Sequence, residues 1–174
     1  EKIGWGHLKR CLALANYIND YTETVFIMSQ FNEEAKEAID LAGSSFYEIP
    51  QNLKHADEVK YYPPSCKNIV IDLGHRETLE RPAEYTKYLI KLDKLKHNIA
   101  VIDGLGNESY RSKKAPKIKA YIQPYWGVPE ETKPFSQYWL HGPKFVLVDE
   151  IYHRCFRKRL KGTIKKILIT FGGA

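Results

Sequence analysis

The segment 67–103 constrains the fold most, because it has the pattern of a strand, a helix and a second strand. The apolar runs 69–71 and 99–102 each end at a carboxylate, Asp72 and Asp103, as short buried strands do. Between them, apolar side chains recur at helical spacing after Pro82, at Tyr85, Tyr88, Leu89, Leu92 and Leu95. Because parallel strands need such a crossover helix, the segment predicts a parallel α/β unit.

The same alternation of strand and helix begins earlier in the chain. Residues 24–28 and 46–49 are expected to be strands. Between them, Asn32 is a helix cap with two glutamates behind it, and Gly43 stops that helix. The order predicts a Rossmann-like, doubly wound and mainly parallel sheet with helices on both faces.

A glycine-rich bend opens a helix near the start of the chain. Gly4 and Gly6 precede an apolar stripe at helical spacing, so the helix is expected to begin near His7. The free N–H groups of a helix start attract anions, glycines let a phosphate or sugar approach the backbone, and Arg10 adds a positive charge. A histidine such as His7 is the residue type that most often takes a proton from water in catalysis. The alternative is that His7 is a cap or a surface residue.

Ligands of open parallel sheets bind beyond the carboxyl ends of the strands. Asp72 and Asp103 end two of the expected strands, and glycines and His75 follow them. We therefore expect His7, Asp72, His75 and Asp103 to share a substrate-binding edge. The alternative for each aspartate is that it caps a helix or holds backbone N–H groups of its loop.

Composition excludes several classes of protein. The three cysteines are far apart, which favours reduced thiols in the cytoplasm, and the six histidines have no metal-ligand spacing. We expect no metal and no cofactor. The chain also lacks the run of about 18 apolar residues that spans a membrane.

The net charge of +6 is concentrated in one segment, 154–166. An amphipathic helix with a solvated basic face is favoured there over a nucleic-acid surface. Residues 123–143, rich in proline and aromatic side chains, are expected to form a loop that covers the core; a sugar-facing wall is the alternative.

The two ends of the sequence predict a larger protein. A doubly wound fold has a strand before its glycine bend, so a first strand is expected ahead of Gly4. Residues 166–171 have the pattern of a strand, and Gly172 and Gly173 follow it as a second glycine turn. We expect an N-terminal domain over 1–164 and the truncated start of a second domain over 165–174.

Four motifs in this order resemble the UDP-sugar hydrolases of the pseudaminic acid pathway, with the related spore-coat polysaccharide proteins and MurG-like glycosyltransferases of the two-domain GT-B fold. They are Gly4-x-Gly6-His7-x-x-Arg10-Cys11-Leu12-x-Leu14-Ala15, Val101-Ile102-Asp103, Gly142-Pro143-Lys144-Phe145-Val146-Leu147-Val148 and Ile169-Thr170-Phe171-Gly172-Gly173-Ala174. Hydrolases of this family often carry an aromatic residue two places after the aspartate that ends the central strand, and this chain has Gly74 there. The resemblance therefore assigns no tyrosine to the site at this position.

The resemblance implies a metal-independent, cytoplasmic hydrolase of surface-glycan biosynthesis, of the nonulosonic acid type. Water would release UDP from an amino-deoxy sugar by attack at the anomeric carbon, with His7 as the general base. The second domain, whose first glycine turn contains Gly172 and Gly173, would bind the uridine and most of the diphosphate. Two alternatives stay open: a GT-B glycosyltransferase, and a non-catalytic module that binds nucleotide sugars or nucleic acid.

Overall fold

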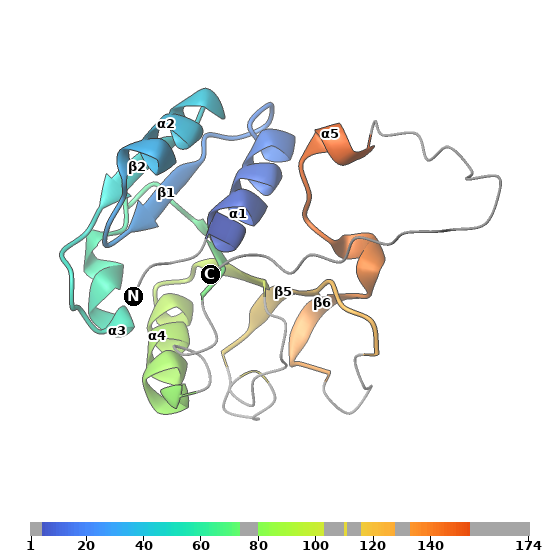
Figure 1. Cartoon of the computed structure of the whole chain (residues 1–174). Coiled ribbons are helices and arrows are strands. Elements are labelled where there is room, and N and C mark those ends of the chain that lie inside the picture. The colour runs from blue at the N-terminus through green and yellow to red at the C-terminus, as the bar shows by residue number, and fades with distance from the viewer. Residues whose placement is uncertain (1–4, 74–79, 103–109, 111–115, 128–132, 154–174) are drawn as a thin grey trace.

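The computed structural model describes residues 5–73, 80–102, 110, 116–127 and 133–153 (Figure 1). Its strands form two sheets, and all strand pairs are parallel. One sheet has the order β3 (Asn68–Ile71), β4 (Asn98–Ile102), β5 (Ile118–Gln123) and β6 (Ser136–His141). The other pairs β1 (Val25–Met28) with β2 (Ser45–Glu48). The prediction of a parallel α/β fold is confirmed.

The helices lie between and beside these strands. They are α1 (Trp5–Ile18), α2 (Glu33–Leu41), α3 (His55–Glu58), α4 (Pro82–Lys94) and α5 (Glu150–His153), with the short 3-10 helices η1 (Val59–Tyr61) and η5 (Pro143–Phe145). The start of α2 is the predicted one: the side chain of Asn32 accepts a hydrogen bond of 2.8 Å from the backbone N–H of Ala35. Gly43 follows the helix with φ of 67°, a conformation that glycine adopts without strain.

The larger core lies between α4 and the four-stranded sheet. One face of the helix buries Tyr85, Tyr88, Leu89 and Leu92. These side chains pack against Ile71, Ile99, Val101, Ile118 and Tyr121 of the strands. Leu95, expected on the same face, is instead 56% exposed. It is the residue that caps the end of α4, and Lys96 after it has φ of 60°, so the chain has already left the helical path.

The smaller core lies where α1 and α2 flank β1 and β2 (Figure 1). Leu8, Phe31, Ala35 and Ile39 form its buried centre, and the rings of Phe31 and Phe46 are 5.2 Å apart. All of β1 is only half-buried, and Val70 in β3 is 42% exposed. In the described part of the chain, β1 and β3 each pair with one strand only. The strand expected ahead of Gly4 stays a prediction.

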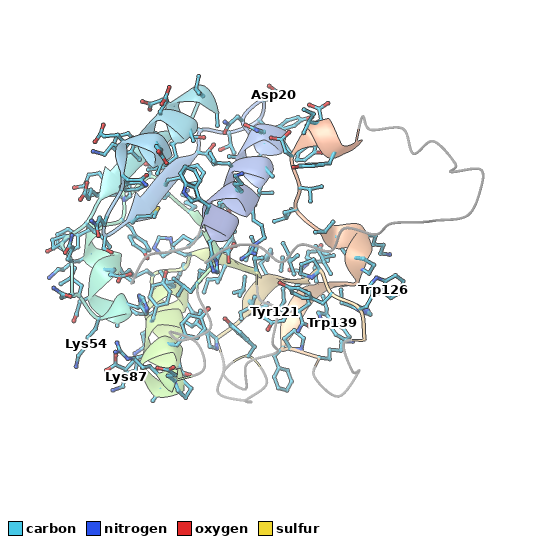
Figure 2. The ribbon with its side chains drawn as sticks, viewed as in Figure 1. Asp20, Lys54, Lys87, Tyr121, Trp126 and Trp139 are labelled. Carbon is cyan, nitrogen blue, oxygen red and sulfur yellow. The ribbon has the colours of Figure 1, made fainter. Side chains whose placement is uncertain are left out.

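The expectation of a loop over 123–143 is wrong. Residues 136–141 form β6, which pairs with β5 in a register that places Gln123 opposite His141. The expected cover is also only partial. Trp139 packs against the core, whereas Tyr125, Trp126, Phe135 and Tyr138 are exposed. Figure 2 shows Trp126 on the outer side of the molecule, well apart from α1.

Several expectations fall on residues outside the described ranges. These are the basic segment 154–166, the strand over 166–171 and the domain boundary at 164–165. No helix in the described ranges is both long and apolar enough to cross a membrane.

Candidate functional site

The first turn of α1 meets the carboxyl end of β3. His7 is the third residue of α1, and Asp72 directly follows the last residue of β3. Nδ1 of His7 lies 2.7 Å from Oδ1 of Asp72. The Asp72 side chain is 2% exposed and that of His7 is 27% exposed, so the carboxylate is enclosed while water can reach the imidazole.

Arg10 completes the cluster from the same face of α1, since residues three apart on a helix are neighbours. Its Nε donates to Oδ2 of Asp72 over 3.0 Å, and its Nη2 donates to Oδ1 over 2.9 Å. Such a bidentate pair between a guanidinium and a carboxylate is among the stronger hydrogen-bonded arrangements in proteins. The same Nη2 lies 3.0 Å from Nδ1 of His7, so all three side chains touch one another.

The charges of the cluster hold Asp72 in its ionised form. Burial by itself raises the pKa of this carboxyl, but hydrogen bonds from His7 and Arg10 and the positive charge of Arg10 bring the pKa below its ordinary value. Burial also acts against the charge of Arg10, and the hydrogen bond and charge of Asp72 more than offset it, so the pKa of Arg10 is raised. The ion pair therefore persists at physiological pH.

Cys11 lies on the inner side of this cluster. Its Sγ donates a weak hydrogen bond of 3.9 Å to Oδ2 of Asp72. Burial, with the nearby negative charge of Asp72, raises the pKa of the thiol to about 12. Thiolates are the reactive form of cysteine, so this side chain is a neutral hydrogen-bond donor and not a nucleophile at physiological pH.

Of the residues predicted for the site, the structure brings three together: His7, Arg10 and Asp72. Gly6 is described too, and it lies inside α1 because the helix begins at Trp5, about two residues before the expected start. A side chain added at Gly6 would meet nothing within 4 Å, so this part of the helix surface is open. The other predicted site residues lie outside the described ranges: Gly4, His75, Asp103, Gly172 and Gly173.

The turn after β5 brings near the cluster a residue that the sequence assigned to the covering segment 123–143 and not to the site. Tyr125 follows the end of β5 by two residues, and its phenol lies close enough to Arg10 to contribute to the raised pKa of that guanidinium. The carbonyl oxygen of buried Gln123 accepts hydrogen bonds from the N–H of Tyr125 (2.8 Å) and of Gly142 (2.9 Å). The Gln123 side chain accepts one from Nε1 of Trp139 (2.7 Å). The position of Tyr125 after an apolar strand was the available signal.

Among the described residues, no group of three or more histidine, cysteine, aspartate or glutamate side chains is arranged to hold a metal ion. Comparison of the chain with protein-family models, with curated proteins and with solved structures found no match.

Proposed function

We propose that this chain is the Rossmann-like N-terminal domain of a two-domain, GT-B-type enzyme that hydrolyses a UDP-linked amino-deoxy sugar. The observation that carries the proposal is the contact of 2.7 Å between Nδ1 of a partly exposed His7 and the buried carboxylate of Asp72. An imidazole held in this way is the usual arrangement of a general base.

In the proposed reaction, His7 accepts a proton from a water molecule. The water oxygen forms a bond to the anomeric carbon of the sugar, and the bond from that carbon to the diphosphate oxygen breaks. The electron pair of the broken bond leaves with UDP, and the products are UDP and the free sugar. The negative charge of Asp72 stabilises the positive charge that develops on His7 during this step.

The first turn of α1 supports the binding of an anionic substrate. Its N–H groups carry partial positive charge, and the surface beside Gly6 is open. Arg10 uses Nε and Nη2 on Asp72, and its Nη1 makes no hydrogen bond to the described residues, so this nitrogen can bind a further acceptor. In this proposal the diphosphate also contacts the glycine turn at Gly172 and Gly173, as the resemblance implies.

The test is UDP release by the full-length protein from a panel of UDP-amino-deoxy sugars, with and without a chelator. We expect release in water that needs no acceptor and is unaffected by the chelator. His7→Gln is expected to lower kcat by about 10²- to 10⁴-fold, the usual contribution of a general base. His97→Gln is the matched control, because His97 lies after α4 and away from the Asp72 cluster.

Three outcomes contradict the proposal. Release that requires an added acceptor identifies a glycosyltransferase. Binding of the UDP-sugar without release or transfer identifies a non-catalytic module. Release that survives His7→Gln at the wild-type rate removes His7 from the mechanism.

A further inference from the structure

We propose that Asp72 is a positioning residue: together with Arg10 it holds His7 as the tautomer that carries its proton on Nδ1, and so directs the Nε2 lone pair away from the cluster. The catalytic consequence rests on the proposed function. The tautomer itself does not, and it can be measured in the absence of any substrate.

Both oxygens of the Asp72 carboxylate are occupied by donors from the protein. Oδ1 lies within 2.9 Å of both Nδ1 of His7 and Nη2 of Arg10, and Oδ2 receives Nε of Arg10 and the thiol of Cys11. A carboxylate has about four lone-pair positions, and here four donors surround it. With 2% of the side chain exposed, no position is left for a sugar hydroxyl. This geometry favours a positioning role over the direct substrate contact expected from the sequence.

The contact with Asp72 determines which nitrogen of His7 carries the proton. An ionised carboxylate accepts hydrogen bonds and donates none, and the pKa of Asp72 is lowered by its partners. A contact of 2.7 Å from Nδ1 to Oδ1 is therefore a hydrogen bond only if Nδ1 carries the proton. An unprotonated Nδ1 would accept the longer contact of 3.0 Å from Nη2 of Arg10, but its lone pair would then face a carboxylate lone pair at the shorter distance of 2.7 Å. Nε2 is then the nitrogen free to accept a proton.

Arg10 contacts both Asp72 and His7. Its guanidinium neutralises Asp72 and stands 3.0 Å from Nδ1 of His7. The two hydrogen bonds from Arg10 fix the orientation of the Asp72 carboxylate and keep it ionised. Arg10 therefore acts on His7 through Asp72, by holding in place the oxygen that accepts the Nδ1 proton.

The substitution Asp72→Asn separates this role from simple packing. An asparagine keeps the shape of the side chain but replaces one acceptor oxygen by an NH2 donor. If the NH2 group of the asparagine faces His7, it donates to Nδ1, and the ring proton moves to Nε2. If it faces the other way, its NH2 meets Nε of Arg10 and the thiol of Cys11, which are donors themselves. In the first orientation the NH2 also meets Nη2 of Arg10, so neither orientation satisfies all partners. The Nδ1–H tautomer keeps its acceptor only in the second orientation, so its population should fall below that of the wild-type protein.

The experiment is nitrogen NMR of the full chain labelled with ¹⁵N-histidine, without substrate, with His7→Gln to assign the His7 signals. We expect His7 in the wild-type protein to be the Nδ1–H tautomer, and the Nδ1–H population to fall in Asp72→Asn. His97, whose ring makes no hydrogen bond within the described part of the chain, is the internal reference and should not change. An Nε2–H tautomer for His7 in the wild-type protein overturns the proposal, and that measurement depends on no variant.

The kcat and KM of Asp72→Asn distinguish this proposal from the proposed function. If Asp72 positions His7, Asp72→Asn lowers kcat by roughly 10²- to 10⁴-fold with KM close to unchanged, by analogy with other carboxylate–histidine pairs. A raised KM with unchanged kcat would instead identify a substrate contact and overturn the proposal. An Nδ1–H tautomer in a protein that releases no UDP would overturn the proposed function and support the assignment of Asp72.

Discussion

Nδ1 of His7 and Oδ1 of Asp72 lie 2.7 Å apart although 65 positions separate the two residues in the chain. The contact joins the first turn of α1 to the residue that follows β3, and Arg10 braces it from the next turn of the helix. Because the carboxylate is enclosed and the imidazole is not, the cluster has a buried charged side and an accessible side that can take a proton.

The lowered pKa of Asp72 predicts a loss of stability in acid. The unfolded carboxyl has a pKa of about 3.9 and the native one a lower value, so between the two the unfolded chain binds more protons. The stabilisation is complete above the unfolded pKa and is lost as the pH falls through the native pKa. Urea unfolding of wild type and Asp72→Asn across this range should show the steeper fall in wild type. Parallel curves would contradict the prediction.

The raised pKa of Cys11 predicts that its thiol is alkylated slowly. In the native protein at pH 8, the thiol, with a pKa of about 12, should resist alkylation by iodoacetamide, while Cys66 outside the cluster serves as the reference. Peptide mass spectrometry measures the two rates separately. In urea the two rates should converge, because burial causes the difference. Equal rates in the native protein would show that Cys11 is not held as described.

The core beneath α4 predicts that two leucines close in sequence contribute very differently to the free energy of unfolding. Leu89 is fully buried against the sheet, so Leu89→Ala should lower the free energy of unfolding by about 2–5 kcal/mol. Leu95→Ala is the matched control: its side chain lies at the exposed end of the helix, and we expect a change within about 0.5 kcal/mol. Denaturant titration of both variants tests the pair, and similar losses would place Leu95 in the core after all.

Tyr125 is expected to affect substrate binding if the proposed function holds. Its phenol lies near Arg10, and hydrogen bonds to Gln123 fix the turn that carries it. We expect the Tyr125 hydroxyl to donate a hydrogen bond to the bound substrate, so Tyr125→Phe should raise KM by roughly two- to tenfold and leave kcat nearly unchanged. Trp126→Phe is the control, because Trp126 is 85% exposed and lies apart from α1 in Figure 2. An equal effect of both variants would argue against a specific contact.

Periodicity in the sequence predicts most of the elements that surround the site. The apolar runs near β1, β3 and β4, the cap at Asn32 and the stripe of α4 are local signals, and the structure confirms each. The strand β6 has no such signal. Its buried and exposed residues do not alternate, and it lies among prolines and exposed aromatic side chains that are typical of loops.

For the candidate site, the sequence by itself determined that His7 and Arg10 share one face of a helix, because that depends only on helical spacing. It also placed Asp72 at the end of a strand. Only the tertiary structure decided that the Asp72 carboxylate lies against those two side chains and that four donors enclose it. The physical reason is that local propensity sets the elements, whereas the packing of α1 against the end of β3 sets which side chains of distant elements come into contact.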